Sequence, residues 1–153
     1  MTPTIVQFET SAKVSGNRAA VFSHWLDPEA RQRYEAPEDS GMRYKNFAPV
    51  QGGVEVVEIV HAGAVIGEMV QRLIVVTPPA LIVSQLTGTF NGVTSMALQI
   101  TMRFEEEDGV TGIHATSQIV DITGRDVKPE HEAGWAQMFA KFTADFAAHG
   151  RDL

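Results

Sequence analysis

The chain contains no cysteine, which excludes disulfides, thiolate metal sites and cysteine nucleophiles. A cysteine-free sequence fits a reducing compartment, so we expect a cytoplasmic protein. Lysine and arginine are also scarce, with 12 against 19 aspartates and glutamates, and the net charge is -7. This balance disfavours nucleic acid and anionic membrane surfaces as partners.

The sequence also lacks targeting and membrane-spanning segments. Residues 1–4 have neither the basic nor the apolar stretch of a signal peptide. The longest apolar run, around residues 73–76, ends at Thr77-Pro78-Pro79 and is far too short to cross a bilayer. We therefore expect a soluble protein. At 153 residues the chain is long enough for a proper core, and we expect a single domain over residues 1–153.

Sequence motifs for metals, nucleotides and nucleophilic serines are missing too. The histidines have no zinc spacing, and no nucleophile elbow, phosphate loop or dinucleotide fingerprint occurs. We expect no metal and no cofactor. The acidic run at residues 105–108 is most simply a solvated turn. We expect each histidine to be a surface or capping residue, and the five are His24, His61, His114, His131 and His149.

Local signals divide the first third of the chain into a strand and two short helices. Residues 4–14 mix apolar and polar positions as a strand does. Asn17 is a good N-cap for a helix over residues 18–26. Asp27 can cap a second helix over residues 28–34, and Pro28 suits the first position of that helix. Residues 36–41 have the composition of a loop.

The middle of the chain reads as strands separated by turns. In the clearest strand, alternate residues from Met96 to Phe104 are apolar, as expected where one face of a sheet is dry. Turns are expected at residues 51–53, 62–63 and 108–109, and a loop at 88–92. We expect strands over residues 42–47, 54–61, 67–76, 80–86, 93–104 and 110–122.

The last element is a long helix, opened by Pro129 and ended by a glycine cap at Gly150. Its apolar stripe would cover the dry face of the sheet. The predicted fold is α+β: a curved antiparallel sheet of six or seven strands wrapped around the C-terminal helix. The stripe consists of Trp135, Phe139, Phe142 and Phe146, with Met138 beside it.

Several short motifs then resemble one family, in the right order along nearly the whole chain. Residues 22–29 (FSHWLDPE) resemble the first-helix motif of the SRPBCC or START-like superfamily, in the branch named for the activator of the heat-shock-protein-90 ATPase. Gly52-Gly53 resembles that branch's early turn, and residues 77–81 (TPPAL) resemble a later one. Residues 131–135 (HEAGW) resemble the start of its final helix. Tyr34-Glu35-Ala36-Pro37 departs from the family's Trp-Trp-Gly-Pro.

The resemblance implies a helix-grip fold with a hydrophobic cavity between the sheet and the long helix. Family members include ligand carriers, polyketide cyclases and chaperone regulators linked to stress response, and the fold does not choose among them. The binding candidates on this reading are Trp25, Tyr34, Met69, Met96, Leu98, Ile100, Met102, Trp135, Met138 and Phe139. Tyr34 would keep an aromatic side chain at the mouth of the pocket. The alternative is that these residues only pack the core.

Three functions stay open at this point. The first is binding of a small hydrophobic molecule without catalysis, which the sequence favours. The second is a cyclase or dehydratase acting on a hydrophobic or polyketide-like substrate, for which we assign no catalytic residue. The third is a protein-interaction module, acting on a chaperone or as a homodimer. Residues worth testing as acid or base are Tyr34, Glu35, His61 and His114, and strand polar residues that could face inward are Gln71, Gln85, Gln99, Arg72 and Arg103.

Overall fold

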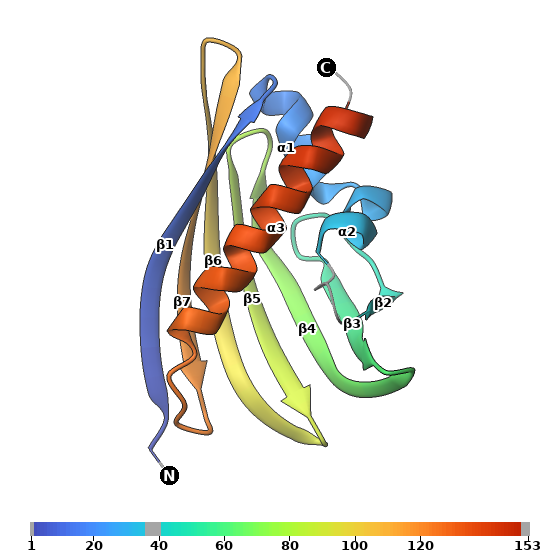
Figure 1. Cartoon of the computed structure of the whole chain (residues 1–153), viewed down its shortest axis with the longest axis vertical. Coiled ribbons are helices and arrows are strands. Elements are labelled where there is room, and N and C mark those ends of the chain that lie inside the picture. The colour runs from blue at the N-terminus through green and yellow to red at the C-terminus, as the bar shows by residue number, and fades with distance from the viewer. Residues whose placement is uncertain (1, 36–40, 151–153) are drawn as a thin grey trace.

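The computed structural model describes residues 2–35 and 41–150. It is an α+β fold in which one curved, seven-stranded antiparallel sheet is covered by a long C-terminal helix (Figure 1). The elements, in chain order, are β1 (Thr4–Ser15), α1 (Arg18–Leu26), α2 (Pro28–Tyr34), β2 (Gly41–Asn46), β3 (Val54–His61), β4 (Ala64–Thr77), β5 (Leu81–Phe90), β6 (Val93–Glu107), β7 (Val110–Asp121) and α3 (Lys128–His149). This is the helix-grip architecture that the sequence predicts.

The sheet has the strand order β1-β7-β6-β5-β4-β3-β2, so β1 and β2 form its two edges. From β2 onward every connection joins neighbouring strands, and three hairpins have two-residue turns. Both residues of each turn have positive φ, as a type I′ turn requires. These turns are Ala62-Gly63, Asn91-Gly92 and Asp108-Gly109.

The two short helices carry the chain from one edge of the sheet to the other (Figure 1). Both are capped as expected. The Asn17 side chain accepts a hydrogen bond from the Ala20 amide at 2.8 Å, and the Asp27 side chain accepts one from the Ala30 amide at 2.9 Å. The cap at Asp27 starts α2 directly after α1 and so fixes the corner between the two helices.

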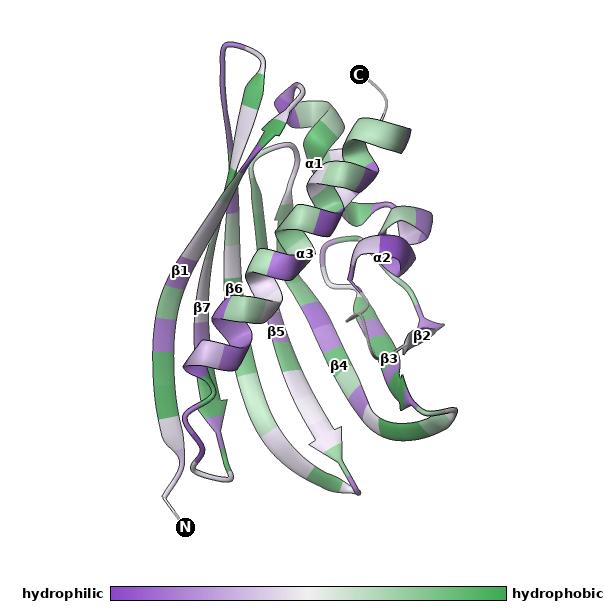
Figure 2. Ribbon diagram, viewed as in Figure 1, coloured by the Kyte–Doolittle hydropathy of each residue, from purple (hydrophilic) through white to green (hydrophobic). Residues whose placement is uncertain are grey.

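The core lies between the concave face of the sheet and α3, where the apolar stripe of the helix meets alternate strand residues (Figure 2). Leu98, Ile100, Met102 and Phe104 of β6 are buried as the alternation predicts. The stripe of α3 is buried along its whole length, through Trp135, Phe139, Phe142 and Phe146.

The strands run further than the sequence suggests. β4 begins at Ala64, and β5 continues through Gly88 to Phe90, where a loop is predicted. Gly88 has a packing role there, because a Cβ at this position would lie 2.9 Å from the Met96 side chain. The predicted glycine cap at Gly150 is only partly right, since Gly150 ends the helix with φ -64 and not in the left-handed region. Of the loop predicted at residues 36–41, residues 36–40 lie outside the described part of the chain.

Within residues 2–35 and 41–150, no helix is both long and apolar enough to cross a membrane.

Candidate functional site

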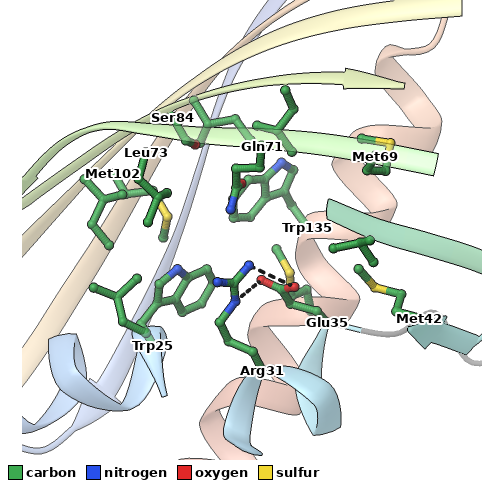
Figure 3. A pocket seen from close by; sticks show the side chains of 16 residues that line it. Trp25, Arg31, Glu35, Met42, Met69, Gln71, Leu73, Ser84, Met102 and Trp135 are labelled. Carbon is green, nitrogen blue, oxygen red and sulfur yellow. Dashed lines mark hydrogen bonds and ion pairs between the residues drawn. The ribbon is translucent and has the colours of Figure 1, made fainter. Parts of the chain in front are cut away.

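A cavity of about 190 Å³ lies between the sheet, α2 and α3 (Figure 3). Apolar side chains from β3, β4, β5 and β6 form most of its wall, and α3 closes it from the opposite side. The strands supply these residues because alternate side chains on each strand point toward the helix. The wall consists of Trp25, Leu26, Arg31, Glu35, Met42, Val57, Met69, Gln71, Leu73, Ile82, Ser84, Leu86, Ile100, Met102, Trp135 and Met138.

The two tryptophans of the sequence both line this cavity. The rings of Trp25 and Trp135 are nearly parallel, with an interplanar angle of 3° and centroids 6.4 Å apart. Trp25 is held by Tyr34 and Phe142, whose rings lie 4.9 Å from it. The indole faces are therefore fixed by packing before any ligand arrives, which reduces the entropy lost on binding.

One end of the cavity is charged. Arg31 of α2 points toward Glu55 of β3, and its Nη1 donates to both carboxylate oxygens of Glu55 at 2.7 and 2.8 Å. The Glu55 side chain is fully buried, and Arg31 is 4 % exposed. The Gln71 amide and the backbone N–H of Ala48 also donate to Glu55, at 2.8 and 3.2 Å. Glu55 is thus hydrogen-bonded on every side, as a buried carboxylate must be.

Glu35, which follows α2, is the second carboxylate bonded to Arg31. The Arg31 Nε donates to Glu35 Oε1 at 3.0 Å, and the hydroxyl of Tyr44 donates to Glu35 Oε2. Burial lowers the pKa of Arg31, but the carboxylates around it, Glu35 first, raise that pKa by more, so the guanidinium stays charged. Burial, followed by the charge of Glu35, raises the pKa of Tyr44. The aromatic rings of Tyr44 and Phe47 lie 5.3 and 4.6 Å from the guanidinium carbon.

Two neutral polar groups, Gln71 and Ser84, lie on the sheet side of the cavity. They stand on the neighbouring strands β4 and β5, and the Cα partner of Ser84 is Leu73, two residues from Gln71. Ser84 is 5 % exposed, so its hydroxyl faces the cavity. Together with the charged end, these groups can hold the polar part of a bound molecule while the tryptophans and methionines surround its apolar part.

A wider hollow of about 770 Å³ adjoins the cavity along the first half of α3. It reaches Ile59 and Phe90 on the sheet and His131 on the helix. Burial lowers the pKa of His131, which favours its neutral form. The hollow shares Glu35, Met69, Ile100, Trp135 and Met138 with the cavity, so the two spaces lie side by side.

Most of the binding candidates named from the sequence come together here. Tyr34 is 1 % exposed, its hydroxyl donates to the Trp25 carbonyl, and it lines the hollow but not the cavity. Phe139 packs in the core and lines neither space. On the cavity wall are Trp25, Met69, Ile100, Met102, Trp135 and Met138, and in the adjoining hollow are Met96 and Leu98.

Of the four residues considered as acid or base, only Glu35 lines the cavity. His61 is exposed at the end of β3. His114 lies on the opposite face of β7 from the buried residues, and its Nε2 is 3.7 Å from Glu105 Oε2 near the hairpin tip. Burial raises the pKa of Tyr34, and its hydroxyl is already engaged, which leaves it no acid–base role.

The structure shows which face of the sheet each of the polar strand residues occupies. Gln71 faces the cavity, whereas Gln85 and Gln99 are exposed on the outer face, where the Gln85 amide donates to Gln99 at 3.4 Å. Arg72 and Arg103 are exposed as well. The expectation that each histidine is a surface or capping residue fails for His24, whose side chain is 10 % exposed and whose Nε2 lies 2.8 Å from Asp145.

Sequence reasoning named Glu35 and Gln71 but missed Arg31 and Glu55, the buried ion pair of the charged end. Glu55 lies between two valines in a strand with apolar residues on both faces, so alternation does not show which way it points. Arg31 is one of two arginines on α2. A spacing signal did exist, since Arg31 precedes Glu35 by one helical turn. Among the described residues, no group of three or more His, Asp and Glu side chains is placed to hold a metal ion.

Comparisons with known proteins agree with this architecture. An uncharacterized protein from Rhizobium leguminosarum is similar over 97 % of this chain and 98 % of its own, with 19 % identity and a TM-score of 0.82. The Mll3558 protein from Rhizobium loti is similar over 95 % of this chain and 99 % of its own, with 18 % identity and a TM-score of 0.85. The CV1439 protein from Chromobacterium violaceum covers 90 % of this chain and 94 % of its own, at 16 % identity and a TM-score of 0.77.

At these identities the structural neighbours establish the fold alone. The search of curated proteins found no match. A family model matches residues 16–147, from the turn before α1 almost to the end of α3, and its description is "Activator of Hsp90 ATPase homolog 1-like protein". That span contains α1, α2, six of the strands and all but the last two residues of α3, and hence every residue of the cavity wall. The chain therefore belongs to the Activator of Hsp90 ATPase homolog 1-like family.

Proposed function

We propose that the protein binds a small, mainly apolar molecule in the cavity between the sheet and α3. The observation that carries this proposal is a preformed cavity of about 190 Å³ whose wall is mostly apolar and includes both tryptophans. An apolar pocket with a few polar groups on its wall is the usual form of a site for a small molecule.

The neighbouring hollow supports the same proposal, because it supplies a way in. Met69 and Met138 stand where the cavity meets the hollow. Their unbranched side chains can change rotamer at little cost and so can let a molecule pass or adapt to its shape. A cytoplasmic location, a homodimer and a chaperone partner remain predictions from the sequence.

A cavity-filling variant tests the proposal directly. Leu86 of β5 lines the cavity, and Leu86→Phe would occupy part of it. Val83 lies on the same strand with the opposite orientation, so Val83→Phe makes the same kind of change outside the cavity. Native mass spectrometry of freshly purified protein would show a co-purified molecule, and that molecule should be lost from Leu86→Phe but kept by Val83→Phe.

A titration complements the mass measurement if nothing co-purifies. Octan-1-ol should quench or shift the tryptophan fluorescence of the wild type with saturation, because Trp25 and Trp135 both line the cavity. Affinity should fall in Leu86→Phe and persist in Val83→Phe. An equal response of all three proteins, or no saturable response, would refute binding in this cavity.

A cyclase- or dehydratase-type enzyme is the second candidate, and one observation favours it. Glu35, whose side chain is 16 % exposed, is an ionisable group on the wall of an otherwise mostly apolar cavity. Such a carboxylate can move a proton to or from a bound substrate. An enzymatic reading predicts turnover of a bound substrate that Glu35→Gln abolishes without loss of binding, whereas a carrier returns the molecule unchanged.

A further inference from the structure

The charged end of the cavity looks at first like a receptor for an anion, because it contains a buried arginine. The hydrogen bonds of Arg31 argue against this. Its Nη1 donates to both oxygens of Glu55, and its Nε donates to Glu35 at 3.0 Å. Its Nη2 also points to Glu35, with a long contact of 3.5 Å. A guanidinium that is engaged by two carboxylates has little left to offer a third.

The charges around Arg31 lead to the same conclusion. One guanidinium and two carboxylates sum to one negative charge, since Arg31 contributes +1 and Glu35 and Glu55 contribute -1 each. Glu55 is fully buried, and Glu35 lines the cavity itself. The interior around them is poorly screened, so a second anion placed here meets repulsion that solvent does not remove.

The remaining polar groups on the wall are the acceptors of Glu35, Gln71 and Ser84 and the indole N–H donors of Trp25 and Trp135. Glu35 presents a carboxylate to the cavity. The Gln71 Nε2 donates to Glu55 at 2.8 Å, which leaves the carbonyl oxygen and the second N–H of that amide for other partners. The Ser84 hydroxyl can accept or donate. A ligand that donates hydrogen bonds finds acceptors here, whereas a carboxylate meets the negative charge of Glu35 even where it reaches an indole N–H.

We infer that the cavity selects molecules with an apolar body and a polar group that is cationic or a neutral hydrogen-bond donor, and that it rejects carboxylates. This inference rests on the proposed binding function and names the ligand chemistry of the same cavity. Amines, alcohols and phenols fit it, whereas fatty acids and other apolar carboxylates do not. The discrimination depends on Glu35, the carboxylate that faces the ligand.

The test uses three probes with the same apolar body, namely octylammonium, octan-1-ol and octanoate. Their binding to the full chain is followed by tryptophan fluorescence and by calorimetry, at about 0.15 M salt so that the overall charge of -7 is largely screened. We expect octylammonium and octan-1-ol to bind at least about tenfold more tightly than octanoate, because the partly buried carboxylate of Glu35 repels the carboxylate of octanoate.

Two variants with the same change in net charge separate the local effect from the global one. Glu35→Gln keeps the shape of the side chain and should reduce the preference of octylammonium over octanoate by about tenfold. Glu132→Gln, at an exposed position of α3, should leave that preference unchanged. Circular dichroism checks that both variants are folded.

The outcomes distinguish the two proposals. If octan-1-ol binds but octanoate binds as tightly as octylammonium, the inference is wrong and the binding function stands. The inference is also overturned if Glu35→Gln changes the preference no more than Glu132→Gln does. If none of the three probes binds, the proposed function fails, and the inference fails with it.

Discussion

Replacing Arg31 by methionine should destabilise the protein strongly, because it leaves Glu55 as an unpaired charge in the interior. Methionine keeps the length of the side chain but removes the donors that lie 2.7 and 2.8 Å from the Glu55 oxygens. Only the neutral donors of Gln71 and Ala48 would remain around a fully buried carboxylate. Breaking a buried ion pair on one side lowers the free energy of unfolding by about 3–5 kcal/mol.

The measurement is urea unfolding followed by the fluorescence of Trp25 and Trp135, both of which are buried and kept in the variant. For a chain of this length, the loss corresponds to a fall in Tm of about 10 °C. Arg43→Met is the matched control, because Arg43 pairs with Glu58 at the surface and is 65 % exposed. That change should lower the free energy of unfolding by less than about 1 kcal/mol.

A double variant checks the reasoning independently of the magnitude. Arg31→Met combined with Glu55→Gln removes both charges, so it should recover more than about 1 kcal/mol relative to Arg31→Met alone. The argument would be refuted if Arg31→Met were as mild as Arg43→Met. It would also be refuted if the double variant were no more stable than the single one.

Three further predictions concern stability. Burial raises the pKa of Asp145, but hydrogen bonds from Arg33 and His24 lower that pKa by more, so the stabilisation that Asp145 provides is present above about pH 4 and is lost as pH falls below that value. Asp145→Asn should therefore reduce the loss of unfolding free energy at acid pH, as measured by urea unfolding at several pH values. An unchanged pH dependence would contradict this prediction. Gly134→Ala should raise the free energy of unfolding by about 0.5–1 kcal/mol, because nothing lies within 4 Å of the added methyl group on α3; a thermal melt with a lower Tm would count against this. Gly53→Ala should lower the free energy of unfolding by about 2 kcal/mol or more, because the added methyl group would lie 2.1 Å from the backbone oxygen of Ala48. A thermal melt like that of the wild type would show that the turn relaxes freely.

The fold was predictable because its local signals agree with one another. The alternation from Met96 to Phe104 fixes which face of β6 is dry, and the spacing of aromatic residues on α3 supplies the cover for that face. Asn17 and Asp27 mark the starts of two helices by a chemistry that depends only on neighbouring residues. Where the boundaries were missed, as at Gly88, the strand continues because packing across the sheet outweighs the local preference of glycine.

The candidate site was only half predictable. Periodicity places Ile100, Met102 and Trp135 on the faces of the sheet and of α3 that meet, whereas the cavity between them was expected only from the family resemblance. The charged end could not be predicted, because Arg31 of α2 and Glu55 of β3 are 24 residues apart in the sequence and meet only through tertiary packing. Sequence patterns report which face a residue occupies, whereas pairing between distant faces is decided by three-dimensional packing.

The pairing of β1 with β7 has a consequence for how the chain must be made. Strands β2 to β7 follow one another as neighbours, so each can pair soon after its predecessor is formed. β1 is the exception, because Thr4 pairs with Asp121 across almost the whole length of the chain. During synthesis β1 therefore waits without a partner until β7 has emerged, and over that interval β1 presents unpaired backbone groups to other chains. Aggregation during expression is then governed by the docking of β1, and slower translation near the end of the sequence would lengthen the exposed period.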